Sequence, residues 1–194
     1  MMKKEDKKFG LNSDHIIEYK KKLLHESEIS LWLDSYQDIF SDFDPRPYSQ
    51  KGLSEDFLSE AKKASIDKSG GIELELLVPA NKRDNVHEAT IKKRLKEHFN
   101  KHYILLKKEI NYTIVQGISF IVFGLILMFI ATLILFNYGN STILISFLII
   151  VLEPGGWFLF WEGLGLVVFK SKTIRPNLVF YEKMSKSYIH FLSY

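Results

Sequence analysis

The chain has 194 residues, a formal net charge of +3 at pH 7 and no cysteine. This length suits one small domain and a short additional segment. The lack of cysteine excludes disulfides and thiolate metal sites. Acidic residues are interleaved with the lysines in the first half of the chain, and this nearly neutral balance argues against a nucleic-acid partner.

The first 110 residues carry strand and helix patterns typical of a small α/β domain. Apolar spacing predicts a helix at Ser13–Leu24, and alternation of apolar and polar residues predicts short half-buried strands at Glu28–Asp34 and Ile72–Val78. Between them, Ser54 is the predicted cap of a helix whose apolar side is formed by Leu53, Phe57, Ala61 and Ala64. This strand–helix–strand order implies a parallel pair.

A long apolar stretch follows. A helix predicted from Asn85 to about Lys108 leads into it, and no charged residue occurs between Glu109 and Glu153. About 20 apolar residues cross a hydrocarbon layer of about 30 Å, so the neutral turn Asn137–Ser141 divides the stretch into a transmembrane hairpin. We expect this hairpin at 111–169, with helices at 112–136 and 142–169.

Flanking charge predicts the orientation. Lysine and arginine flank both outer ends of the hairpin and are absent from its turn. By the positive-inside rule, we expect a multi-pass protein of the inner (plasma) membrane with both termini in the cytoplasm. The basic residues beside the membrane are expected to meet lipids, including anionic headgroups.

Residues 170–194 are predicted to pack on the N-terminal domain. Pro176 precedes a short predicted helix at Asn177–Lys186, and Tyr188–Tyr194 is typical of a strand. A two-stranded sheet is marginal, so we expect this strand to complete the sheet. The predicted fold class is α/β plus transmembrane: a two-helix hairpin with a small cytosolic α/β domain built from both sides of it.

The second predicted membrane helix carries two carboxylates and a helix breaker. Pro154-Gly155-Gly156 predicts a break, Glu153 falls near the bilayer centre, and Glu162 falls near the cytoplasmic boundary. A charge at the bilayer centre costs several kcal/mol. Glu153 is therefore a structural group that is protonated or hydrogen-bonded, a proton- or cation-handling site, or the partner of a cation from another subunit.

Small residues recur every seven positions along the first predicted membrane helix, at Gly117, Gly124 and Ala131. Seven residues return to nearly the same side of a helix, and small side chains let helices approach closely in lipid. The stripe predicts either packing against the second helix or a self-association surface.

The segment Ser41–Ser49, with the sequence SDFDPRPYS, follows the first strand. Asp38, Asp42 and Asp44 with Arg46 predict a stiff structural loop, a docking loop for a partner, or a ligand or hard-cation site. No glycine-rich phosphate loop or complete catalytic set accompanies them, so we favour neither an enzyme nor a cofactor.

A metal site is not expected elsewhere either. His98 and His102 have the spacing of a two-histidine metal site, but Glu97 precedes the first histidine, whereas the zinc-protease motif places a glutamate directly after it.

The loop SDFDPRPYS followed by LSEDFL, together with EPGGWFLFWEGL in the second apolar segment, resembles an uncharacterised group of small prokaryotic two-span membrane proteins. The resemblance implies this topology and no activity. We expect a membrane-anchored interaction or regulatory subunit that forms a homo-oligomer or binds a partner membrane subunit. The alternative is a homo-oligomeric channel or a proton- or cation-conducting protein that uses Glu153.

Overall fold

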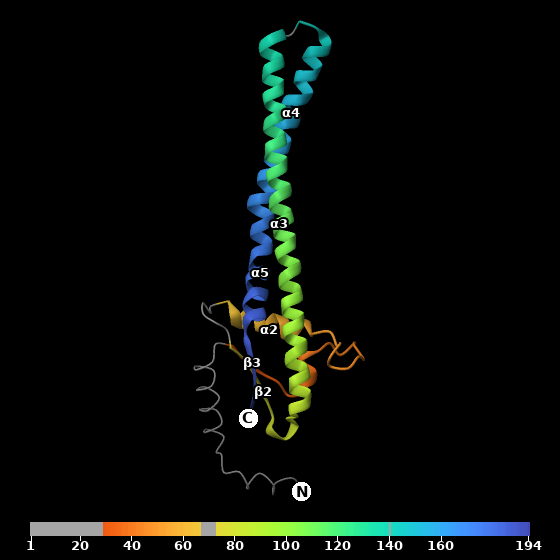
Figure 1. Ribbon diagram of the computed structural model, residues 1–194, viewed down its shortest axis with the longest axis vertical. Helices are drawn as coiled ribbons and strands as arrows, with labels where there is room; N and C mark the ends of the chain where they lie inside the picture. The colour runs from red at the N-terminus through yellow and green to blue at the C-terminus, as the bar shows by residue number, and fades with distance from the viewer. Residues whose placement is uncertain (1–28, 67–72, 140) are drawn as a thin grey trace. The chain divides into compact units, whose positions relative to one another are not determined.

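The computed structural model describes residues 29–66, 73–139 and 141–194 (Figure 1). The helix predicted at Ser13–Leu24 lies outside these residues. The described residues form two compact units: one comprises those up to Lys101 together with Phe180–Tyr194, and the other comprises those from His102 to Val179. Both boundaries between the units fall within long helices.

A three-stranded parallel sheet forms the centre of the first unit. Its strands are β1 (Ile29–Trp32), β2 (Glu73–Val78) and β3 (Tyr188–Ser193), in the spatial order β1-β2-β3. Leu74 is in register with Ile29 on one side and Ile189 on the other. The predicted parallel pair and the third strand from the C-terminus are therefore confirmed.

Helices pack on this sheet to form the core. They are α2 (Glu55–Ser65), the beginning of α3 (Asn85–Tyr138) and the end of α5 (Ser171–Lys186). Each helix contributes apolar side chains at helical spacing, as an amphipathic helix does. The contributing residues are Phe57, Ala61, Ile91, Leu95, Phe99, Phe180 and Met184, which pack with Ile29, Leu74, Leu76, Val78, Ile189 and Phe191 of the strands.

The central strand differs from its predicted half-buried pattern. Leu77 is fully buried although it lies on the opposite face from Leu76 and Val78. The rings of Trp32 and Tyr194, from the chain segments on either side of β2, make an edge contact with their centroids 4.3 Å apart. This pair closes over the central strand, so both of its faces are covered.

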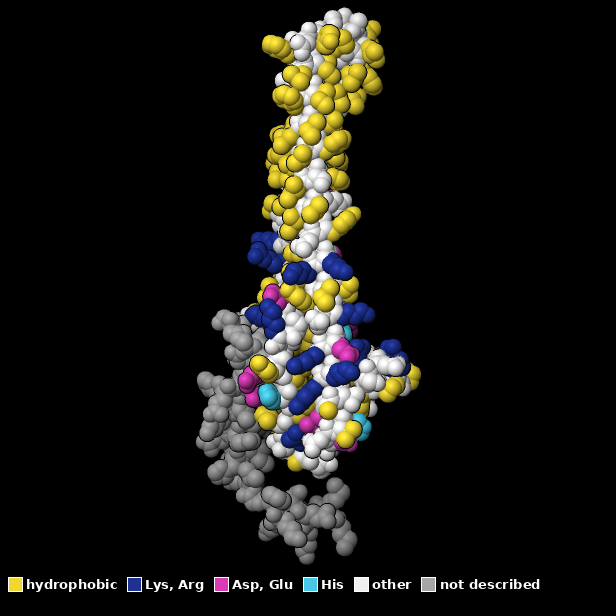
Figure 2. Space-filling view, viewed as in Figure 1, with side chains coloured by type: hydrophobic (Ala, Val, Ile, Leu, Met, Phe, Trp, Pro, Cys, Tyr) yellow, Lys and Arg dark blue, Asp and Glu magenta, His cyan; other side chains and the backbone are white. Residues whose placement is uncertain are grey.

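The second unit contains the apolar helices. The helix predicted to begin at Asn85 continues without interruption to Tyr138 as α3, and α4 (Ile143–Gly165) follows. A π-helical turn, η3 (Leu166–Lys170), joins α4 to α5. Both Asn85–Tyr138 and the continuous helix Ile143–Lys186 are long and apolar enough to cross a membrane. Hydrophobic side chains cover the visible face of this unit (Figure 2).

The predicted effects of two prolines are wrong. Pro154 lies inside α4, so the break expected at Pro154-Gly155-Gly156 does not occur, and Pro176 lies inside α5, which begins at Ser171 and not at Asn177. A proline removes one donor and displaces one carbonyl. Neighbouring turns keep the helix intact here, and the irregularity of the helix is the π-helical turn η3.

The completed sheet gives a matched pair of variants on β3. Phe191 is buried and Tyr188 is exposed on the same strand. We expect Phe191→Ala to lower the free energy of unfolding of the first unit by about 3 kcal/mol, because it leaves a core cavity. Tyr188→Ala should change it by less than about 0.5 kcal/mol. Hydrogen exchange of the β2 amides measures both, and equal effects would contradict the role of β3.

Candidate functional site

The predicted stripe of small residues on α3 lies directly against α4. A Cβ atom added at Gly117 would lie 2.8 Å from the carbonyl oxygen of Gly163, and one added at Gly124 would lie 2.6 Å from that of Gly156. The reciprocal distances from Gly156 to Gly124 and from Gly163 to Gly117 are 2.8 and 2.5 Å. The two backbones are therefore in contact at two positions, where only glycine fits.

The stripe has a counterpart on α4 that sequence reasoning missed. The buried residues of α4 are Ile149, Gly156 and Gly163, which also recur every seven positions. The same antiparallel register sets Ile149 opposite Ala131, and both are buried. The α3 stripe is thus used within the chain. The recurring spacing of Gly156 and Gly163 was the signal that could have revealed its partner.

Glu153 and Glu162 lie on exposed parts of α4 and are not brought together. No other described residue donates a hydrogen bond to either carboxylate. On the neighbouring helix α3, the hydroxyl groups of Ser119 and Thr132 donate to the carbonyls of Val115 and Met128 on their own helix. Nothing in the described part of the chain satisfies Glu153.

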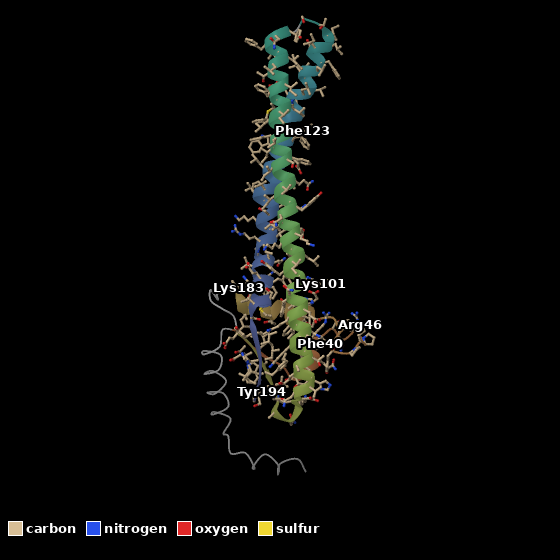
Figure 3. The ribbon with its side chains drawn as sticks, viewed as in Figure 1. Phe40, Arg46, Lys101, Phe123, Lys183 and Tyr194 are labelled. Atoms are coloured by element: carbon tan, nitrogen blue, oxygen red, sulfur yellow. The ribbon has the colours of Figure 1, made fainter. Side chains whose placement is uncertain are left out.

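In the first unit, Asp44 holds the proline-rich loop in shape. Its carboxylate accepts hydrogen bonds from Arg46 Nε at 2.9 Å, Arg46 Nη2 at 2.7 Å and the Gly52 amide at 2.7 Å. These bonds hold the pKa of Asp44 well below its usual value, with the Arg46 side chain as the main cause. Figure 3 shows Arg46 on the protruding loop and Phe40 at its base beside α3. A bridge between Phe40 and Leu53 closes the loop.

The other two aspartates of the predicted cluster, Asp38 and Asp42, do not share the hydrogen-bond partners of Asp44. Asp38 accepts hydrogen bonds from the amides of Asp34 at 2.7 Å and Ser35 at 2.9 Å, and so caps the short helix η1 (Tyr36–Ile39). Asp42 is exposed, and no described residue is bonded to its side chain. Among the described residues, no three histidine, cysteine or acidic side chains are grouped to hold a metal ion.

A pocket of about 440 Å³ lies between this loop, η1 and the first turns of α3. Lys51 lines it and is only 9% exposed. Its Nζ donates to Gln37 Oε1 at 2.6 Å, and Gln37 Nε2 in turn donates to the Tyr48 hydroxyl oxygen at 3.0 Å. His87 and Thr90 contribute the wall on α3. These residues come from three elements without a linear motif, so sequence reasoning did not find the pocket.

A buried ionic network fixes the start of α3 beside this pocket. Arg83 donates to Glu88 through Nε at 2.8 Å and Nη2 at 3.0 Å, and the Tyr36 hydroxyl donates to Glu88 Oε1 at 2.9 Å. Burial by itself raises the pKa of Glu88, but the hydrogen bonds from Arg83 and Tyr36 outweigh it, so the pKa is lowered. Burial raises the pKa of Tyr36. The network ties α3 to η1, which carries Gln37.

The first turn of α3 is capped by Asp84. Its Oδ1 accepts from the Val86 amide at 2.8 Å and the His87 amide at 3.3 Å, and its Oδ2 lies 3.0 Å from His87 Nδ1. The two amide hydrogen bonds are the main reason why the pKa of Asp84 is lowered. Asp84 thus orients the His87 ring at the edge of the pocket.

Comparison of the chain with protein-family models, with curated proteins and with solved structures finds no match in any of the three.

Two adjacent glycines of α4 offer a direct test of the helix contact. A Cβ atom at Gly156 would lie 2.8 Å from the Gly124 carbonyl oxygen, whereas one at Gly155 would meet nothing within 4 Å. We expect Gly156→Ala to lower the thermal midpoint of the purified protein by several degrees. Gly155→Ala should leave it unchanged or raise it, because alanine favours the helix by about 1 kcal/mol. Equal midpoints for the two variants would contradict the close packing.

Proposed function

We propose that the chain is a membrane-anchored interaction or regulatory protein. Its two apolar helices span a prokaryotic inner membrane as a hairpin, and both termini lie in the cytoplasm. The first unit uses the loop Ser41–Ser49 to dock a partner. The observation that carries the proposal is a fully exposed phenylalanine, Phe43, held at the tip of a rigid loop.

The apolar surface of the second unit supports the membrane location. Large aliphatic and aromatic side chains are exposed along α3 and α4, among them Phe123, Phe129, Phe147 and Trp157. Such a large apolar surface is unfavourable in water and suits a hydrocarbon environment. Lysine and arginine are concentrated near the helix ends that adjoin the first unit, at Lys107, Lys108, Lys170, Lys172 and Arg175. They favour a cytoplasmic location there and contact with anionic headgroups.

The loop has the features of a docking element. Phe43 is 98% exposed and contributes nothing to the core. Buried aromatic anchors dominate the energy of many protein interfaces, and a preformed loop loses little conformational entropy on binding. Asp44 fixes the backbone that follows the tip, through the amides of Arg46 and Gly52. The loop therefore presents a single apolar side chain to a partner from a preformed backbone.

Cysteine labelling tests the membrane topology on a chain that has no native cysteine. We expect Ser141→Cys, in the turn between the helices, to react with a membrane-impermeant maleimide in sealed right-side-out vesicles. Ser193→Cys, at the end of β3, should react only after the vesicles are permeabilised. Labelling of Ser193→Cys in intact vesicles would reject the proposed orientation.

Photo-crosslinking tests the docking loop. A photoreactive residue at the exposed Gln50 should give a discrete crosslinked product in native membranes, and Phe43→Ala should remove that product without lowering the thermal midpoint. Val86→Ala is the matched control, because Val86 is an apolar side chain of the same unit that is 75% exposed. A product that survives Phe43→Ala, or a native loop that crosslinks to nothing, would reject docking through Phe43.

The second candidate function is an oligomeric channel or proton- or cation-conducting protein. The observation that favours it is the Glu153 side chain, which is exposed on α4 and has no hydrogen-bond partner among the described residues. A carboxylate within a membrane usually faces a protein interior or water. Two helices are too few to enclose a pathway, so several copies would have to assemble with Glu153 facing inward.

Flux measurements distinguish this alternative. Liposomes that contain the native protein should conduct protons or cations, and Glu153→Gln should abolish that conductance at equal incorporation. Glu162→Gln provides the control, because it removes a carboxylate from the same helix outside the proposed pathway. Absence of flux from folded native protein over several ions and pH values would reject the channel, and docking would be the remaining candidate function.

A further inference from the structure

The pocket beside the loop has a positive charge that nothing in the described part of the chain balances. Lys51 is nine-tenths buried, and no described carboxylate lies within ion-pair distance of its ammonium group. Its partner is the neutral Gln37 amide, 2.6 Å away. A buried charge is costly unless an opposite charge or several hydrogen bonds compensate it.

The other ionisable side chains at the pocket are already paired. Asp44 is the one carboxylate among the described lining residues, and Arg46 and Gly52 occupy it. His87 is bonded through Nδ1 to Asp84, which lies outside the lining. The pocket therefore offers an incoming group one uncompensated cation and no competing free carboxylate.

The hydrogen bonds inside the pocket run in one direction and leave donors unused. Lys51 donates to Gln37 and Gln37 donates to the Tyr48 oxygen. An ammonium group carries three donor hydrogens and a tyrosine hydroxyl carries one. Two hydrogens of Lys51 and the hydroxyl hydrogen of Tyr48 consequently remain for another acceptor. Unused donors around a buried cation are complementary to an anion.

We propose that this pocket binds a small organic anion, whose phosphate or carboxylate group is held by Lys51 and the Tyr48 hydroxyl. The volume of about 440 Å³ exceeds what the anionic group alone would fill. Pro45, Pro47 and the Tyr48 ring line the remaining space and suit the carbon skeleton of such a molecule. The site is separate from the exposed Phe43 side chain and does not depend on docking by the loop.

Ligand-induced stabilisation of the full chain in detergent tests the proposal. The probes are inorganic phosphate, glycerol 3-phosphate and citrate, each compared with sodium chloride at equal ionic strength. At least one probe should raise the thermal midpoint of the native protein in a concentration-dependent manner, because a ligand that binds only the folded state stabilises it. Stabilisation by the two phosphates alone or by citrate alone would identify the anionic group.

Two substitutions locate the effect at the pocket. Lys51→Met removes the ammonium group but keeps most of the unbranched side chain, and it should weaken the binding of the effective probe by at least about tenfold. Gln37→Glu places a carboxylate beside the ammonium group, so it should stabilise the free protein and eliminate the response to the probe. Lys93→Met is the control, because the Lys93 side chain is 80% exposed.

The Gln37→Glu result shows whether the probe binds at this pocket even where Lys51→Met does not fold. A native protein that responds to none of the three probes beyond sodium chloride overturns the proposal. A response that persists in Gln37→Glu, or that is lost equally in Lys93→Met, also overturns it. Loss of the Phe43-dependent crosslink leaves this result unaffected.

Discussion

The pairing of β3 with β2 is the interaction on which the architecture depends. These neighbouring parallel strands are separated in sequence by the whole of α3, α4 and α5. A parallel pair needs a crossover connection, commonly a single helix. Here the crossover includes the entire apolar hairpin, so the sheet closes only when the hairpin returns the chain. Folding of the first unit and pairing of the two long helices are thereby coupled through one set of backbone hydrogen bonds.

Contact between backbones gives the hairpin its specificity. Side chains in lipid gain little from the hydrophobic effect, so helices there associate through close packing. Glycine on both helices, at Gly117 with Gly163 and at Gly124 with Gly156, allows this approach. Exposed residues such as Glu153 and Trp157 are left for contacts outside the chain. The side of α4 that faces α3 is therefore restricted to small residues at the glycine contacts, whereas its exposed side can carry large or charged residues.

The elements that the sequence pattern predicted within the described residues are present, because burial in one direction leaves a regular pattern in the sequence. This holds for β1, β2, β3, α2 and the start of α3. Prediction failed at Pro154 and Pro176, where a local preference for breaking a helix is outweighed by the helical turns on either side. Local rules describe what a residue prefers, and the surrounding packing decides whether that preference is met.

The candidate site was less predictable than the fold for a related reason. Asp38, Asp42 and Asp44 are close in sequence, yet one caps η1, one is exposed and one binds Arg46. In contrast, Gln37, Lys51 and His87 are distant in sequence and meet only when the loop and α3 are both in place. Proximity in sequence was therefore a poor guide to which charged side chains lie together in the structure.

The seven-residue repeat on both helices has a mechanical consequence. A repeat of this kind could let one helix slide past the other by a heptad, about 10 Å, and find glycine opposite glycine again. Sliding in one direction would bring Ile149 against Gly124, where the backbones leave no room for its side chain. Sliding in the other would set Lys170 against Gly117. The large residues at the ends of the stripe act as stops, so the hairpin resists piston-like movement.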